Sequence, residues 1–129
     1  MYALAKHLVL ELRDCDRAVL DDQPFLRRAL HRAAQELGVT VLGESFHRFE
    51  PQGVSGILFV AESHLAIHTW PEHGYAAVDI FTCGDSVHFE AAAQLIIEEL
   101  RAKNPAAIEM SRGVIPSAER ALIQPKRMP

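Results

Sequence analysis

Hydrophobic and polar positions alternate over residues 2–12 and the alternation ends at the polar cluster Arg13–Asp16, which predicts a first strand followed by a loop. After Asp21 and Asp22, either of which can cap a helix, the apolar spacing changes to three and four residues. The apolar face of this predicted amphipathic helix consists of Phe25, Leu26, Ala29, Leu30, Ala33 and Leu37. Gly38 then follows as a stop signal.

Strand-like patterns occupy the middle of the chain, and turn residues separate them. The predicted strands cover residues 39–49, 54–62, 64–69 and 75–83. A second amphipathic helix is predicted over residues 87–103, and Pro105 ends it. A short last strand over 107–110 and a polar tail over 113–129 complete the pattern.

This order of elements is typical of the α+β class. We expect an antiparallel β-sheet with two helices packed on one face, an α/β sandwich. The 129 residues, 49% of them hydrophobic, suit one domain spanning residues 1–129. Since so small a domain often completes its cleft against a second copy, we expect a homodimer in which a face or edge of the sheet is covered.

Composition and charge exclude several function classes. The 13 basic and 17 acidic residues give a charge of −4 without a basic stripe, which argues against nucleic acid as a partner. The first apolar run is interrupted by charged residues, so it predicts neither a signal peptide nor a membrane span, and the cytoplasm is the expected compartment. The two cysteines are expected to be free thiols, and the acidic neighbours of Cys15 should raise its pKa, so we assign it no role.

The chemistry-bearing residues concentrate in residues 62–84, which hold Ser63, His68 and Cys83. Taken singly, each suits a structural role better: a turn serine, a core histidine and a small buried thiol. His64 and His68 have the spacing of a helical zinc motif, but an extended segment would hold them about 13 Å apart, so no metal site is predicted. The chain has neither a G-x-S-x-G elbow nor a phosphate-binding glycine loop.

Taken together, these residues resemble the small prokaryotic form of S-adenosylmethionine decarboxylase. The motifs that carry the resemblance are AESHLAIHTWPEHGY at 61–75, DIFTCG at 79–84, FHRFEPQGVSG at 46–56, KHL at 6–8 and CD at 15–16. They occur in order over most of the chain, and the match weakens after about residue 113. Lys6 stands where the family usually has arginine.

The resemblance implies that the chain is a proenzyme that cuts itself between Glu62 and Ser63, giving a β chain 1–62 and an α chain 63–129. Ser63 would become a pyruvoyl group that forms a Schiff base with the substrate, so no external cofactor is expected. His68 matches the processing proton acceptor, and Ser55 matches its helper. Cys83 matches the residue that returns a proton to the substrate carbon.

For the substrate, the resemblance implies that S-adenosylmethionine is converted to its decarboxylated form and CO2 for spermidine biosynthesis. Phe49 would stack on the adenine and Glu72 would hold the ribose hydroxyls. The expected assembly is a homodimer of processed protomers, with two α and two β chains. Two alternatives stay open: a pyruvoyl-dependent L-ornithine or L-arginine decarboxylase, and a non-catalytic partner subunit.

Strand parity places a condition on this site. Ser63 and His68 are five residues apart, so they would point to opposite faces of an unbroken strand. The roles assigned to them therefore predict a bend or break near residue 63.

Overall fold

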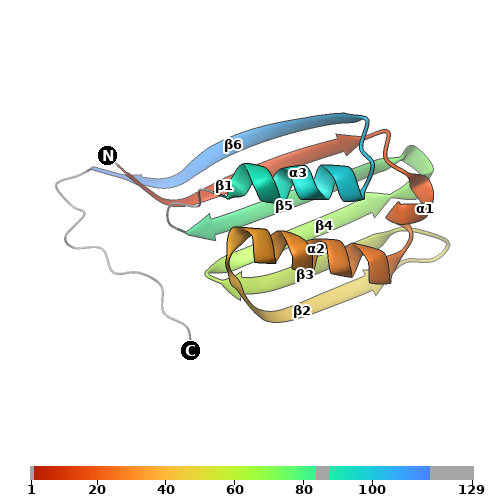
Figure 1. Ribbon diagram of the computed structural model, residues 1–129, viewed down its shortest axis with the longest axis horizontal. Coiled ribbons are helices and arrows are strands. Elements are labelled where there is room, and N and C mark those ends of the chain that lie inside the picture. Colours follow the sequence, from red (N-terminus) through yellow and green to blue (C-terminus); the bar gives the residue numbers. More distant parts are fainter. Residues whose placement is uncertain (1, 84–87, 117–129) are drawn as a thin grey trace.

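The computed structural model describes residues 2–83 and 88–116. Its centre is one six-stranded sheet with the strand order β2-β3-β4-β5-β1-β6, and every pairing is antiparallel (Figure 1). The strands are β1 (Tyr2–Arg13), β2 (Thr40–Arg48), β3 (Val54–Ala61), β4 (Ser63–Trp70), β5 (Tyr75–Cys83) and β6 (Asn104–Ile115). The helices are α1 (Arg17–Leu20), α2 (Gln23–Leu37), η1 (Pro71–His73) and α3 (Phe89–Glu99).

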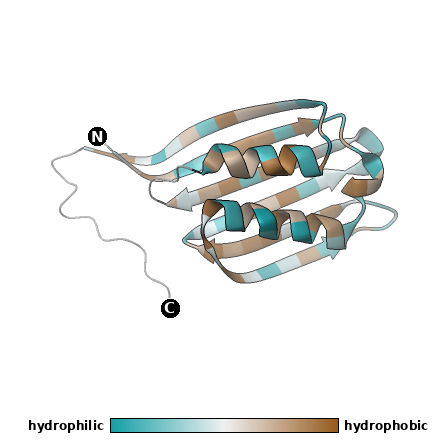
Figure 2. Ribbon diagram, viewed as in Figure 1, coloured by the Kyte–Doolittle hydropathy of each residue, from teal (hydrophilic) through white to brown (hydrophobic). Residues whose placement is uncertain are grey.

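The two longer helices, α2 and α3, lie side by side on one face of the sheet (Figure 1). Leu26 and Leu30 of α2 and Ile96 of α3 are fully buried against strand residues such as Leu65 and Ile80. Hydrophilic residues of α2 occupy the side that faces away from the sheet (Figure 2). The predicted α+β architecture, with both helices on one face, is thus confirmed.

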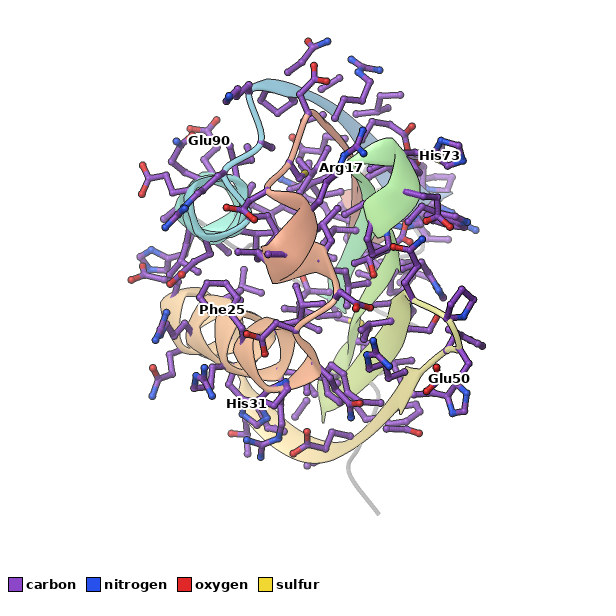
Figure 3. All side chains as sticks on the ribbon, turned by 90° about the vertical axis from the view of Figure 1, so that its right-hand side faces the viewer. Arg17, Phe25, His31, Glu50, His73 and Glu90 are labelled. Carbon is purple, nitrogen blue, oxygen red and sulfur yellow. The ribbon has the colours of Figure 1, made fainter. Side chains whose placement is uncertain are left out.

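The opposite face of the sheet is covered by no helix of the described residues (Figure 3). Along β3, β4 and β5, buried side chains that point to the helices alternate with half-buried or exposed ones that point away. We call the second set the open face. It comprises Ser55, Ile57, Phe59, His64, Ala66, His68, Trp70, Tyr75, Ala77, Asp79, Phe81 and Cys83.

Local signals set the bounds of α2. The Asp22 carboxylate accepts a hydrogen bond from Phe25 N at 3.1 Å, so Asp22 is the N-cap. Gly38, with a φ of 71°, ends the helix in the left-handed conformation that glycine adopts most readily. Asp21 has a different role, because its carboxylate accepts hydrogen bonds from Gly53 N and the Arg48 guanidinium, and these lower its pKa.

Two expectations about the ends of elements are wrong, and one short helix was not predicted. The loop predicted at Arg13–Asp16 is present over residues 14–16, and the unpredicted helix α1, whose N-cap is Asp16, follows it. The second long helix ends at Glu99 rather than 103, and its predicted start at 87 lies outside the described residues. The last strand is 12 residues long because it pairs with nearly all of β1, and as an edge strand it accommodates Pro105.

Of the predicted tail 113–129, residues 113–115 continue β6 and residues 117–129 lie outside the described part. Among the helices that the structure describes, none has the length and apolar character needed to cross a bilayer.

Candidate active site

Ser63 occupies an unusual position at the tip of the β3–β4 hairpin. Glu62 forms the turn and Ser63 begins β4, paired with Val60 on one side and Thr82 on the other. Both partners are buried and point to the helices, so a regular strand would direct Ser63 into the core as well. Instead, Ser63 has a φ of 135°, a value that L-residues rarely adopt, and its Oγ lies 3.6 Å from Cys83 Sγ. The bend predicted near residue 63 is confirmed, while β4 itself continues without interruption.

Cys83 is the last residue of β5 and contributes its thiol to the open face. It is half-buried and free, and its side chain alternates with those of Ile80 and Thr82, which point to the helices. The 3.6 Å contact with Ser63 is within hydrogen-bonding range for sulfur. The structure thus places a hydroxyl and a thiol, separated by 20 residues of sequence, in direct contact beside the Glu62–Ser63 peptide bond.

A second pair forms further along the same face. Ser55 of β3 and His68 of β4 are opposite each other in register, and Ser55 Oγ is 2.8 Å from His68 Nδ1. When Nδ1–H donates to Ser55 Oγ, Nε2 carries the free lone pair and can act as a base. Both residues assigned to processing chemistry, the helper and the proton acceptor, therefore contact each other.

Phe49 and Glu72 lie at the same end of the sheet as this second pair. Phe49 follows β2, is 46% exposed and packs edge-to-face on His47, with 4.5 Å between the ring centroids. Glu72 lies in η1 directly after β4 and is exposed. Gly53, in the turn that contains Phe49, has a φ of 105°, and a Cβ there would lie 3.1 Å from the Thr69 carbonyl oxygen. This close approach places the turn beside the end of β4.

The two pairs are not brought together within one chain. Ser63 and His68 are five residues apart on a continuous strand, which corresponds to about 16 Å between their Cα atoms. An imidazole and a serine hydroxyl cannot bridge that distance. The turn at Ser63 thus places its hydroxyl on the face that carries His68, but a chain by itself holds Ser63 with Cys83 at one end and His68 with Ser55 near the other.

The structure also reveals polar groups that the sequence interpretation did not single out. His7 Nε2 lies 2.9 Å from Asp79 Oδ1, between neighbouring strands on the open face. Thr82 is 2% exposed, and its Oγ1 is without a hydrogen-bond partner among residues 2–83 and 88–116. Asp79 and Thr82 both belong to the DIFTCG motif. Their closeness to Cys83 in the sequence is the signal that could have identified them as candidate site residues.

Two residues near the sheet have raised pKa values. Burial, and a hydrogen bond of 2.6 Å donated to Glu11, raise the pKa of Tyr75 to about 12. Burial, with a smaller contribution from Asp14, raises the pKa of Cys15 to about 11, and its thiol donates to the Leu12 carbonyl oxygen. This confirms the expected effect of an acidic neighbour on Cys15, although burial is the larger cause.

The residues that the structure describes hold no cluster of three side chains able to bind a metal ion. His64 and His68 both belong to β4, which confirms that their segment is extended. Their spacing is therefore that of a strand, where two imidazoles four residues apart are about 13 Å from each other and cannot share one zinc ion.

Comparison with known proteins gives the family. The chain is 51% identical over 123 residues to the S-adenosylmethionine decarboxylase proenzyme of Prochlorococcus marinus, covering 95% of this chain and 98% of that protein. It is 49% identical over 115 residues to the proenzyme of the same name from Thermodesulfovibrio yellowstonii, covering 89% and 85%. The crystal structure of the adenosylmethionine decarboxylase from Aquifex aeolicus superposes with a TM-score of 0.85 at 32% identity, covering 91% of this chain and 97% of that one. Residues 6–113 match the family model described as S-adenosylmethionine decarboxylase, and the chain belongs to that family.

Proposed function

We propose that this protein is a self-processed, pyruvoyl-dependent enzyme that converts S-adenosylmethionine to decarboxylated S-adenosylmethionine and CO2, a step that supplies spermidine synthesis. The observation that carries the proposal is the contact between Ser63 and Cys83 at the tip of a hairpin, in a chain whose relatives are named proenzymes. A serine in a left-handed conformation is costly, by about 1–3 kcal/mol, and such residues concentrate at functional sites.

Self-cleavage begins with the Ser63 hydroxyl. Its Oγ attacks the carbonyl carbon of Glu62, the bond between that carbon and the Ser63 nitrogen breaks, and the hydroxyl proton ends on the released amine. The product is an ester isomer of the original peptide. A base then removes the proton from the Ser63 α-carbon, and the ester leaves as the carboxylate of Glu62. We assign this proton to His68 Nε2, with Ser55 holding the other ring nitrogen at 2.8 Å.

The distance of about 16 Å between Ser63 and His68 requires a second copy of the chain for this step. If two open faces pack together about a twofold axis perpendicular to the strands, His68 of the partner subunit lies over Ser63. The axis would lie between the two sheets and run along the row formed by Ile57, Ala66 and Asp79, which is midway between the two pairs. Exposed apolar side chains on this face support such packing, among them Phe59, Trp70 and Ile108. We therefore infer a homodimer with two composite sites.

The elimination leaves dehydroalanine at residue 63, and water hydrolyses it to a pyruvoyl group with release of ammonia. The carbonyl of this group takes up the substrate amine and accepts the electrons released as CO2 leaves. We assign to the Cys83 thiol the proton that the substrate carbon then needs, and its contact with residue 63 supports this role. Phe49 and Glu72 belong to the His68 end of the sheet, so in this dimer the partner subunit's Phe49 and the partner subunit's Glu72 would bind the adenine and ribose.

Mass spectrometry of the denatured, freshly purified protein tests the processing. We expect fragments 1–62 and 63–129, the second lighter than its encoded mass by the difference between serine and a pyruvoyl group. Ser63→Ala should remain one intact chain, and Cys83→Ala should cut itself but turn over poorly. A wild-type chain that stays intact after long incubation would refute the proposal.

Release of labelled CO2 from carboxyl-labelled substrates then tests the substrate. The processed protein should release it from S-adenosylmethionine. Release from L-ornithine or L-arginine instead would keep the processing chemistry and overturn the substrate assignment.

A further inference from the structure

Thr82 carries a buried hydroxyl that the fold itself does not use. The residue is 2% exposed, and its Oγ1 has no hydrogen-bond partner within the described part of the chain. The other buried threonine differs sharply: Thr69 Oγ1 donates to Leu20 O at 2.7 Å and accepts from Val54 N at 2.9 Å. Because buried polar groups are nearly always paired, an unpaired hydroxyl in this position requires an explanation.

The hydroxyl lies beside the bond that the proposed processing breaks. Thr82 is directly opposite Ser63 in the β4–β5 register, so the Cα atoms of the two residues are about 5 Å apart. The side chain of Thr82 is on the face that carries the helices, whereas Ser63 Oγ has turned to the open face and contacts Cys83. The Glu62–Ser63 peptide therefore has its nucleophile on one side of the sheet and the Thr82 hydroxyl on the other.

We propose that the Thr82 hydroxyl donates a hydrogen bond to the Glu62 carbonyl oxygen as that oxygen becomes an oxyanion during self-cleavage. When Ser63 Oγ bonds to the carbonyl carbon, the π electrons move to the oxygen, and the oxygen bends away from the nucleophile toward the helix-facing side. The electrons return as the bond to the Ser63 nitrogen breaks, and the hydroxyl proton ends on that nitrogen, so the step is an isomerisation that needs no co-reactant. This inference rests on the proposed function.

An unsatisfied donor is well suited to this role. A hydroxyl that stabilises the ground state and the transition state equally does not accelerate the step. A donor that is unpaired in the precursor and paired only with the oxyanion stabilises the transition state alone. The O–H group of Thr82 can rotate about the Cβ–Oγ1 bond, so its proton can turn toward the new charge.

Synthesis of the chain in a cell-free translation reaction allows the rate of self-cleavage to be followed from time zero. Thr82→Val removes the hydroxyl while it keeps the shape of the side chain, and we expect it to slow the appearance of fragment 63–129 by about 10²-fold. Thr82→Ser keeps the hydroxyl and should cut at a rate near that of the wild type. His68→Ala is the control for the later elimination step.

Hydroxylamine, which cleaves esters, identifies the step that is slowed. His68→Ala accumulates the ester, so hydroxylamine should cut it rapidly. Thr82→Val should form little ester and should stay intact in hydroxylamine. Thermal unfolding of Ser63→Ala with and without Thr82→Val separates a folding defect from a chemical one, and we expect no loss of stability.

Three results would overturn the assignment of Thr82: cleavage of Thr82→Val at the wild-type rate, rapid cutting of Thr82→Val by hydroxylamine, or a Thr82→Ser variant as slow as Thr82→Val. A wild-type chain that never cuts would instead overturn the proposed function and, with it, this inference.

Discussion

Mixed dimers give the sharpest test of a site built from two chains. One chain carries Ser63→Ala and so has no nucleophile, and the other carries His68→Ala and so has no processing base. Neither should cut itself as a homodimer. In a mixed dimer of composite sites, the intact Ser63 of the second chain meets the intact His68 of the first, so one of the two sites is complete.

The expected yield follows from the geometry. Within one chain about 16 Å separates the two residues, so a chain cannot supply both groups to one site. Random pairing of equal amounts makes about half of the dimers mixed, and every His68→Ala chain in a mixed dimer should be cut. About half of the His68→Ala chains should therefore be processed, and the released fragment 63–129 must carry the His68→Ala substitution.

Co-expression with two affinity tags, followed by isolation of the mixed dimer and mass spectrometry, measures this yield. A matched control pairs the wild-type chain with a chain that carries both substitutions. A composite site then predicts the opposite result, namely that the wild-type chain in the mixed dimer stays intact. Full cutting of the wild-type chain in this control, or no cutting in the first mixture, would refute the composite site.

Three further predictions concern single residues, all in the uncut Ser63→Ala chain. Thr69→Val should lower the free energy of unfolding by about 3 kcal/mol because it leaves two buried backbone groups unpaired. Thr82→Val should raise it by about 1 kcal/mol because the hydroxyl it removes is unpaired. Urea titration measures both, and equal losses of stability would contradict the difference in pairing. Cys15, with its pKa raised to about 11, should resist iodoacetamide at pH 8 until the chain unfolds, and peptide mass mapping would reveal any early modification. The pKa of Tyr75 is raised from its ordinary value of 10.0 to about 12. Between these pH values the folded chain keeps a proton that the unfolded chain loses, so the free energy of unfolding should fall as the pH rises. Tyr75→Phe should reduce that fall, and an unchanged pH profile would exclude this residue as its cause.

Local signals in the sequence predicted the elements that depend on local chemistry. Asp22 and Gly38 bound their helix as expected because capping and a left-handed residue act within one turn. The length of β6 was underestimated because it follows from pairing with β1, which is about a hundred residues away in sequence. Short stretches such as residues 104–115 carry little indication of that distant partner.

The candidate site was predicted in its members but not in their arrangement. The contacts between Ser63 and Cys83 and between Ser55 and His68 join residues that the motifs had already named. The separation of these two pairs is a property of the unbroken strand from Ser63 to Trp70. The unpaired hydroxyl of Thr82 could not be predicted from the sequence, because hydrogen bonding depends on all the three-dimensional neighbours of a side chain.

The strand order has a consequence for the protein after cleavage. A cut between Glu62 and Ser63 severs only a hairpin turn, so it leaves every strand intact. Fragment 1–62 would contain β1, β2 and β3, whereas fragment 63–129 would contain β4, β5 and β6. Since β1 lies between β5 and β6, the two fragments interleave within one sheet and share three strand-to-strand boundaries. The fragments can separate only if all three boundaries open together, so the cut protein should remain a single folded complex. Its unfolding should then depend on protein concentration, as the unfolding of a tightly bound complex does.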